Sequence, residues 1–552
     1  MSQIASDRSP GDHAPIREVH DQSRVHRAKR QGRADPSRAG RQAARAAVSI
    51  GVGAALLLSM VAFDGRPTVF TDTDDYFSQG RATVRAAVNL VTHGRLPFVL
   101  DEASDRLSGA QADEEPIHNQ NGARSAYYGA LLFALQSVGT LWALAAAQSL
   151  AAAWLVHRLW RRVQPDATAW RYVAVMAGLA AATSLPAFAG FAMPDVFAGF
   201  AVIAAVVLTV YGDRVGRGET FALWAVLAAS ANFHSSNALV MLCVAAAGAV
   251  LLWRTGAPWR RWVRPPVLVG SAIAVAVAAG SVYGLVVKLR SGDTLRRPPF
   301  LTARVLADGP GRRWLPTACD HGAKLALCAY RNLPLTDSED ILWSDEPDLG
   351  VFNLAEFRPR ERLSREETGF VLRAVAADPI GQVAASLGNV GGQMLAAEVD
   401  EPVRDPAYYL TDPYWITTNL PGLILGMGGC GADSLGCKPR LSAPVFAVVH
   451  ALGVLASLGL LLAQLARPGA FRRVSVDTET RRAAQASALI LLAVLANAAV
   501  CGALSGPFAR YEARLIWLVP VLALLVLPLL AGRGKAVGGN RAATKGLLLP
   551  AE

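Results

Sequence analysis

Charged side chains are scarce in this sequence, above all inside its long apolar runs. Of the 552 residues, 18% are charged and 52% are hydrophobic. Almost no ionisable group lies in the middle of an apolar run, whereas ion-coupled transporters usually need carboxylates, basic residues or broken helices near the middle of the membrane. The scarcity therefore weighs against a transport function.

The sequence also lacks a basic patch of the kind that binds nucleic acid, although its net charge is +11. Arg and Lys lie mainly in short segments between the apolar runs, which is the distribution that sets topology in membrane proteins. Runs of about 17 to 25 apolar residues recur, each long enough to cross roughly 30 Å of hydrocarbon. We therefore expect an all-α polytopic membrane protein whose partners include membrane lipid and no nucleic acid.

The positive-inside rule predicts about ten spans with both termini in the cytoplasm. Residues 1–45 are rich in arginine and have no apolar run, so we expect a disordered basic cytoplasmic tail. No convincing small-residue cleavage pattern follows, which favours an uncleaved first helix over a signal peptide. The expected spans are about 46–63, 140–157, 171–189, 195–211, 219–233, 235–253, 267–287, 441–466, 483–504 and 513–531.

This topology divides the rest of the chain. Residues 46–289 form an N-terminal transmembrane module, whose first outer loop, 64–124, contains a surface helix running to about residue 92. Residues 125–136 are apolar but too short to cross alone, which predicts an interfacial or re-entrant helix. Residues 290–440 are expected to form a small extracytoplasmic domain, 441–531 the C-terminal transmembrane helices, and 532–552 a cytoplasmic tail.

Cysteine is rare, with six in the chain. Two lie in expected spans, and four lie in the segment expected outside the cytoplasm: Cys319, Cys328, Cys430 and Cys437. Two close pairs in an oxidising compartment favour disulfides, with four unpaired thiols as the alternative. Zinc is disfavoured because neither pair has the short spacing or the neighbouring histidines of common zinc sites.

Three carboxylates follow the first span directly, in the stretch Thr-Asp-Thr-Asp-Asp-Tyr at 71–76. Acidic groups are expensive where a helix leaves the bilayer, so we interpret this stretch as the floor of an active site. Asp72 and Asp74 are suited to holding a divalent metal, Mg²⁺ or Mn²⁺, over a phosphate, or to taking a proton from an acceptor hydroxyl. The alternative is that Thr73 and Asp74 only cap the surface helix and offset its dipole.

Other polar residues lie at the outer ends of the expected spans. Asp195 follows Pro194 and either binds substrate or caps a helix N-terminus. His234 lies between two asparagines, and it either donates a hydrogen bond to substrate or is an interfacial histidine satisfied by its neighbours.

Basic and aromatic residues of the outer face suggest a phosphate site. Arg510 and Arg514 lie four residues apart and suit phosphate clamping by guanidinium groups, the alternative being interface arginines that snorkel. Arg124, Tyr127 and Tyr128 are placed to line an entrance for a lipid headgroup, or to form an aromatic belt at the membrane surface.

The order of polar motifs and apolar runs along the chain resembles that of the C-type glycosyltransferase superfamily, which consists of polytopic enzymes that use polyprenyl-phosphate sugars. The resemblance rests on Asp-Thr-Asp at 72–74, on Arg-Ser-Ala-Tyr-Tyr-Gly at 124–129 leading into an apolar helix, and on Met-Pro-Asp at 193–195 opening a span. It covers roughly the first 290 residues. The Arg-Pro-Pro-Gly-Tyr type of signature is replaced by Arg-Ser-Ala-Tyr-Tyr, and segments 301–311 and 504–512 are similar to membrane proteins of a proteobacterial branch.

In that superfamily, acidic residues of the first loop act as base or metal ligand, and basic residues of the outer face bind the lipid-linked phosphate. The resemblance assigns these roles to Asp72 and Asp74, and to Arg510 or Arg514. It implies a bacterial inner-membrane enzyme that moves a sugar from a polyprenyl-phosphate donor to an envelope acceptor on the extracytoplasmic face. The alternatives are a translocator of lipid-linked glycans and an envelope-assembly protein without catalysis.

Overall fold

The computed structural model describes residues 36–92, 122–291, 295, 297–428, 443–466 and 478–524. The chain divides into two compact units, residues 1–49 and 50–552. Of the first unit, the described part is the beginning of α2 (Pro36–Asp64). All that follows concerns the second unit.

Six described helices are long and apolar enough to cross a membrane, consistent with a multi-pass membrane protein. They are α2, α5 (Ala126–Val163), α10 (Ser235–Arg254), α11 (Trp259–Ser291), α20 (Ala443–Leu465) and α22 (Thr478–Leu504). The pair α15 (Phe357–Ala377) and α16 (Pro379–Leu395) passes the same test only jointly, across a bend of 104°. The described residues therefore provide six or seven such helices where ten spans were expected.

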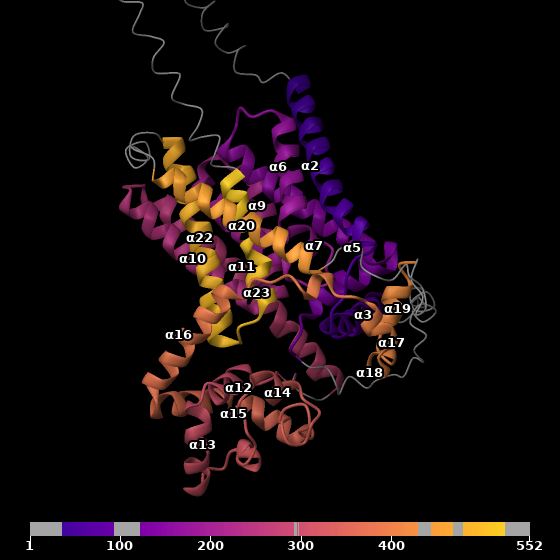
Figure 1. Cartoon of the computed structure of the whole chain (residues 1–552), viewed down its shortest axis with the longest axis vertical. Helices are drawn as coiled ribbons and strands as arrows, with labels where there is room; N and C mark the ends of the chain where they lie inside the picture. The colour runs from indigo at the N-terminus through magenta and orange to yellow at the C-terminus, as the bar shows by residue number, and fades with distance from the viewer. Residues whose placement is uncertain are drawn as a thin grey trace, which may run out of the picture. The chain divides into compact units, whose positions relative to one another are not determined.

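Three expected spans are shorter helices: α6 (Ala169–Ala182), α8 (Val196–Val210) and α9 (Arg217–Phe233). Helix α8 packs against α5, α9, α10, α22 and α23 (Ala509–Ile516), and every one of its residues except Phe197 is buried. These five partner helices are labelled in Figure 1. A helix that is apolar on all sides belongs in a protein interior. Because protein surrounds α8, its length does not have to match the thickness of the hydrocarbon.

The expected short helix at 125–136 and the span after it form a single element, α5, with a break. Gly139 and Thr140 leave the helical conformation, and Thr140 has a φ of 60°. Ser125 caps the N-terminus, since its Oγ accepts a hydrogen bond of 3.3 Å from the Tyr128 N–H.

Helix α3 (Thr71–Thr92) is the expected surface helix, and it packs closely on α5. The contact depends on two glycines, because a Cβ on Gly80 would lie 2.0 Å from the Gly129 carbonyl oxygen, and one on Gly129 would lie 2.2 Å from the Tyr76 carbonyl oxygen. Small residues allow two helix backbones to approach in this way. The crossing sets the position of the first turn of α3, where the acidic run lies.

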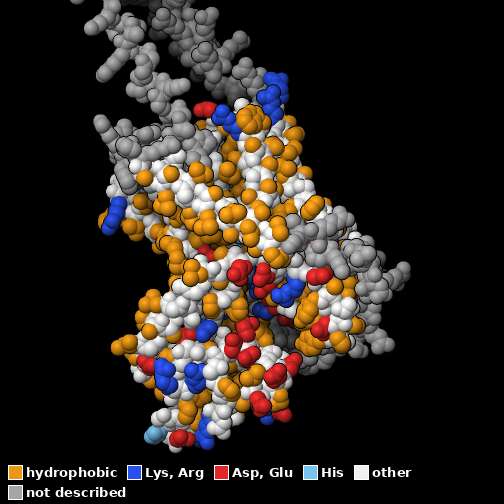
Figure 2. Space-filling view, viewed as in Figure 1, with side chains coloured by type: hydrophobic (Ala, Val, Ile, Leu, Met, Phe, Trp, Pro, Cys, Tyr) orange, Lys and Arg blue, Asp and Glu red, His pale blue; other side chains and the backbone are white. Residues whose placement is uncertain are grey.

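A second hydrophobic core lies in residues 300–377, which we call the 300–377 module. It comprises α12 (Phe300–Ala307), α13 (Pro310–Asp320), η3 (Ala326–Tyr330), α14 (Ser338–Trp343) and α15. Figure 2 shows apolar side chains covering much of the visible surface of the long apolar helices, whereas charged side chains gather over the module.

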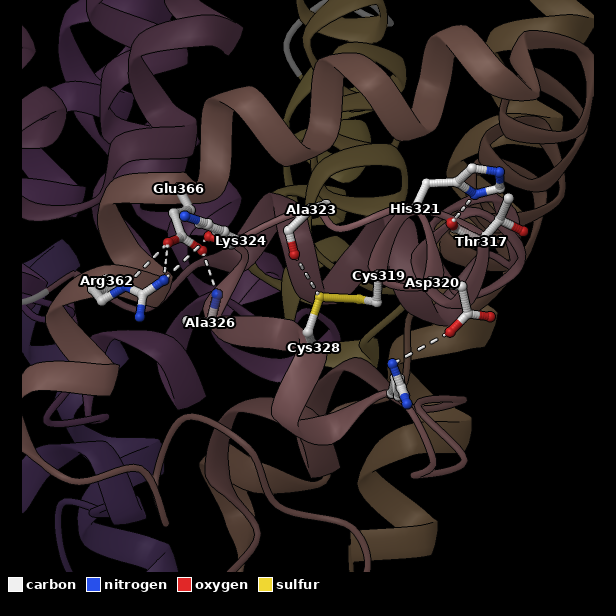
Figure 3. Close-up of a disulfide and its surroundings, with 11 residues drawn as sticks. Thr317, Cys319, Asp320, His321, Ala323, Lys324, Ala326, Cys328, Arg362 and Glu366 are labelled. Atoms are coloured by element: carbon white, nitrogen blue, oxygen red, sulfur yellow. Dashed lines mark hydrogen bonds and ion pairs between the residues drawn. A yellow bond between two sulfur atoms is a disulfide. The ribbon is translucent and has the colours of Figure 1, made fainter.

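The module contains a disulfide between Cys319 and Cys328 (Figure 3). Nearby, Glu366 of α15 accepts a hydrogen bond of 2.7 Å from the Ala326 N–H and forms a 3.1 Å ion pair with Arg362. The hydrogen bond connects η3 to α15, and the ion pair lies within α15. The other expected pair, Cys430 and Cys437, lies outside the described residues.

Four short helices follow α16: η4 (Glu401–Val403), α17 (Ala407–Thr411), α18 (Pro413–Ile416) and α19 (Leu420–Leu425). Two other short helices, α7 (Leu185–Ala189) and η2 (Gly212–Arg214), lie on either side of α8 in the sequence.

The contact between α3 and α5 predicts a steric effect of alanine. Gly80→Ala and Gly129→Ala each place a methyl group against backbone that has no room to move aside, so each variant should lower the free energy of unfolding by about 1–3 kcal/mol. The measurement is SDS-induced unfolding of the purified protein in micelles.

Gly280→Ala is the matched control, because Gly280 lies in α11 with no atom within 4 Å of the added Cβ. Alanine favours helix over glycine by about 1 kcal/mol, so this control should be neutral or stabilising. Equal destabilisation by all three variants would contradict the close helix contact.

Candidate functional site

Arg510, at the start of α23, is the centre of a cluster of charged side chains. Its guanidinium approaches three carboxylates: Glu401 at 3.1 Å, Asp195 at 3.8 Å and Asp72 at 3.9 Å. Its side chain is 11% exposed and lies over the Phe70 ring at 4.4 Å from the centroid. Segments distant in sequence thus meet around one cation.

Backbone pairing explains why the acidic run lies beside Asp195. The Thr68 N–H donates to the Gly190 carbonyl at 3.0 Å, and the Ala192 N–H donates to the Thr68 carbonyl at 2.8 Å. Thr73, at the start of α3, donates its hydroxyl to the Ala192 carbonyl at 3.2 Å. These bonds hold the segment that enters α3 against the segment that leads into α8.

Asp72 also pairs with Arg124, whose Nη2 lies 2.5 Å from the Asp72 carboxylate. Burial alone would lower the pKa of Arg124, but the charge and hydrogen bond of Asp72, together with the charges of Tyr76 and Asp75, outweigh burial and raise the pKa. Trp343 of α14 lies over the same guanidinium, 5.4 Å from ring centroid to Cζ. Arg124 is therefore held between Asp72, at the start of α3, and Trp343 of the 300–377 module.

Asp195 and Arg514 form the buried floor of the cluster. Arg514 has no exposed side-chain surface and lies 3.4 Å from Asp195, whose side chain is 2% exposed. Its Nη2 also donates to Ser236 at 2.9 Å and to Asn497 at 3.1 Å. Asp195 occupies the N-cap position of α8 without capping it, so the capping alternative does not describe its side chain.

The two predicted phosphate-binding arginines therefore differ. Arg514 is enclosed by protein groups and cannot reach a ligand directly, so its expected role in substrate binding is corrected to one of positioning Asp195. The Nε and Nη1 of Arg510 lie at ion-pair distance from Asp195 and Glu401 without a hydrogen bond of good geometry to a described residue, and the Nε of Arg514 likewise forms none. The two arginines differ in exposure: the Arg510 side chain is 11% exposed, which makes it the better suited of the two to an anionic ligand.

His234 lies beside the cluster, where its Nδ1 is 2.8 Å from Ser236 Oγ and its ring is 6.1 Å from the Tyr511 ring. Burial, followed by the charges of Arg514 and Arg510, lowers the pKa of His234 well below its usual range. The imidazole is therefore neutral at pH 7 and suited to hydrogen bonding.

Two carboxylates of the site were not among the predicted residues. Burial raises the pKa of Glu401 above its ordinary value, an effect that the charge of Arg510 opposes. Glu339, on α14, has its pKa raised to about 7 by burial and by the charge of Asp72, with Arg124 acting in the opposite direction. Both belong to segments expected to form a separate domain, and no local pattern distinguishes them from other acidic residues there.

Asp74 does not join the cluster. Its carboxylate accepts two bonds of 2.7 Å from the backbone N–H and the side chain of Asn419, which precedes α19. Residues two apart on a helix point about 200° apart around its axis, so Asp72 and Asp74 face different partners. Among the described residues, no group of three or more His, Cys, Asp and Glu is placed to hold a metal, and a metal on Asp72 and Asp74 stays a prediction.

Tyr128 belongs to the core and not to an entrance for lipid headgroups. It has no exposed surface, its ring packs edge-on against Tyr76, Phe197 and Phe233, and its hydroxyl lies 3.4 Å from Gln148 Oε1. Its expected role in substrate binding is therefore corrected, because the α5 N-terminus turns this side chain inward.

The buried ion pair predicts a large effect of Asp195→Asn on stability. The substitution leaves Arg514 buried without its carboxylate partner, which typically costs about 3–5 kcal/mol. The measurement is again SDS-induced unfolding. Arg365→Gln is the comparison, because it removes an exposed pair with Glu361 whose worth is about 0–1 kcal/mol. Similar losses in both variants would contradict a stabilising role for the buried pair.

The raised pKa of Glu339 predicts pH-dependent anion binding. As the pH falls from 8 to 6, this carboxyl becomes neutral, so a phosphodiester should bind more tightly, by up to about tenfold if roughly 1.4 kcal/mol of repulsion is removed. Titration of nanodisc-embedded protein with a polyprenyl phosphodiester, whose own charge is constant over this range, provides the measurement. Glu339→Gln should abolish the dependence, and Glu346→Gln, an exposed change in the same module, should retain it.

Comparison of the chain with protein-family models, with curated proteins and with solved structures found no match.

Proposed function

We propose that this chain is a membrane glycosyltransferase that transfers a sugar from a polyprenyl-phosphate donor to an envelope acceptor. The observation that carries the proposal is the arrangement around Arg510, whose side chain is 11% exposed and whose guanidinium lies 3.9 Å from the Asp72 carboxylate. An anion-binding cation next to a carboxylate provides the two groups that transfer from a phosphate leaving group needs. The C-type glycosyltransferase resemblance of the sequence supports the same activity.

In the proposed reaction, Asp72 accepts the proton of an acceptor hydroxyl. The acceptor oxygen forms a bond to the anomeric carbon of the sugar, and the bond between that carbon and the phosphate oxygen breaks. The electron pair leaves with the polyprenyl phosphate, whose added negative charge Arg510 stabilises. Arg124 holds the Asp72 carboxylate in place through its 2.5 Å contact.

The proposed location is the outer face of a bacterial inner membrane, with both termini in the cytoplasm. Two observations support this orientation: arginines concentrate in the segments expected inside, and the Cys319–Cys328 disulfide lies in a segment expected outside. Binding of Mg²⁺ or Mn²⁺ near Asp72 and Asp74 stays a prediction, and the reaction above needs no step through a metal.

The test is transfer of radiolabelled sugar from polyprenyl-phosphate donors by protein in proteoliposomes. Asp72→Asn should lower kcat by about 10²–10⁴-fold, the usual contribution of a general base. Arg510→Gln should weaken donor binding and slow transfer further, because it removes the cation at the leaving group. Asp348→Asn, an exposed carboxylate of the module, is the control and should behave as wild type.

Asp74→Asn separates chemistry from structure. It replaces the charged acceptor of the two Asn419 bonds with a neutral amide oxygen and is expected to reduce stability while retaining transfer in the folded fraction. Full activity of Asp72→Asn would overturn the proposal. Flipping of a labelled lipid-linked glycan without sugar transfer, unaffected by that variant, would favour the alternative of a translocator.

A further inference from the structure

Helix α16 exposes one continuous apolar stripe. The exposed residues recur three or four positions apart and are all apolar or glycine: Pro379, Ile380, Val383, Ala384, Leu387, Gly388, Gly391, Gly392, Met394 and Leu395. Several are among the most exposed large hydrophobic side chains described, with Leu395 at 87%, Ile380 at 83% and Leu387 at 66%. Such spacing places them on one face of the helix.

The opposite stripe of α16 is polar and faces protein. Gln382 Nε2 donates to Asp308 at 2.6 Å, and Asn389 Nδ2 donates to the same carboxylate at 2.8 Å. Asp308 is itself buried and paired with Arg304 at 2.6 Å. One turn further on, Gln393 is fully buried. The polar side chains therefore point inward and the apolar ones outward.

This polarity is the reverse of that of a surface helix in water, where the apolar stripe faces the core. In hydrocarbon the outward side chains are apolar, and polar side chains bond to the protein interior. We propose that α16 is embedded in the bilayer, with its exposed stripe in contact with the acyl chains of membrane lipids. This replaces the expectation that residues 290–440 lie wholly outside the membrane.

Three further observations favour lipid as the occupant. No Asp, Glu, Lys or Arg occurs in residues 379–395. Helix α16 packs along α22, which is long and apolar enough to cross a membrane and itself exposes Leu491, Leu495 and Leu504, so the stripe is continuous with a surface already suited to lipid. A helix of 17 residues is about 25 Å long, and its 104° bend from α15 is that of a broken or re-entrant segment.

The last turn of α16 contacts the segment of chain that leads into the charged cluster. Gln393 Nε2 donates to the Phe508 carbonyl at 2.8 Å, and the Phe508 N–H donates to Gln393 Oε1 at 3.0 Å. Phe508 lies two residues before Arg510. A lipid-embedded helix thus holds the backbone that carries the anion-binding arginine, whatever reaction the cluster performs.

The experiment is site-specific photo-crosslinking of the full chain in nanodiscs that contain a radiolabelled phosphatidylglycerol. The photoreactive residue p-benzoylphenylalanine replaces Leu387, or Val383 on the same stripe as a second position. Leu452, exposed on the membrane-long helix α20, is the positive control, and Leu354, exposed in the 300–377 module, is the negative control. Gel filtration establishes that each variant folds as the unsubstituted protein does.

Lipid labelling at Leu387 and Val383 should equal that at Leu452 and exceed that at Leu354 by about tenfold, since hydrocarbon contacts only membrane-embedded groups. Labelling no higher than at Leu354 would overturn the proposal. A crosslink from either position to a second copy of the chain or to another polypeptide, in place of lipid, would also overturn it. The readout does not depend on sugar transfer, so it stands or falls separately from the proposed activity.

Discussion

The charged cluster depends on one buried carboxylate, Asp195, which lies between two arginines. Removing an ion from water costs several kcal/mol, and only close partners and further hydrogen bonds offset that cost. Asp195 is 2% exposed and lies 3.4 Å from Arg514 and 3.8 Å from Arg510. Since α23 carries both arginines and Asp195 precedes α8, this interaction fixes α23 against α8.

The other charged side chains of the cluster differ in how far they are exposed to solvent. Arg514 is enclosed, Arg510 above it is partly exposed, and Asp72 and Glu401 lie at the edge with side chains 16% and 23% exposed. Positions deeper in the protein therefore stabilise the fold, whereas positions nearer to solvent remain able to meet a ligand. Residues of one short helix thus have different roles because of their depth.

Sequence reasoning identified much of this site because charge is costly near a membrane. Asp72, Asp195, His234, Arg510 and Arg124 were singled out as polar groups at the outer ends of apolar runs, and they lie around one cluster. The same reasoning treated Asp72 and Asp74 as a pair, whereas Asp72 contacts Arg124 and Asp74 contacts Asn419, because residues two apart on a helix face different sides. The helical period of 3.6 residues was not applied to these two carboxylates, although the sequence alone would have allowed it.

Other features could not be obtained from sequence in this way. Glu339 and Glu401 belong to the site only because α14 and η4 return to it across long stretches of chain. Ten spans stay a prediction, since an apolar run predicts burial without distinguishing lipid from protein, and α8, one of the expected spans, is enclosed by other helices. The sequence of α16 contains an apolar stripe and a polar stripe. Which of the two faces the protein becomes clear only from the hydrogen-bond partners of the polar side chains.

The separation in sequence between the members of the buried pair has a consequence for biosynthesis. Asp195 precedes Arg514 by 319 residues, so the carboxylate is synthesised and placed beside the bilayer long before either arginine leaves the ribosome. Until α23 arrives, the nascent bundle holds an acid without a counterion, which favours protonation or a water-filled opening at that position. Helix α23 therefore acts as a late, charge-neutralising element of assembly, and a chain that ends before it would be a natural substrate for membrane quality control.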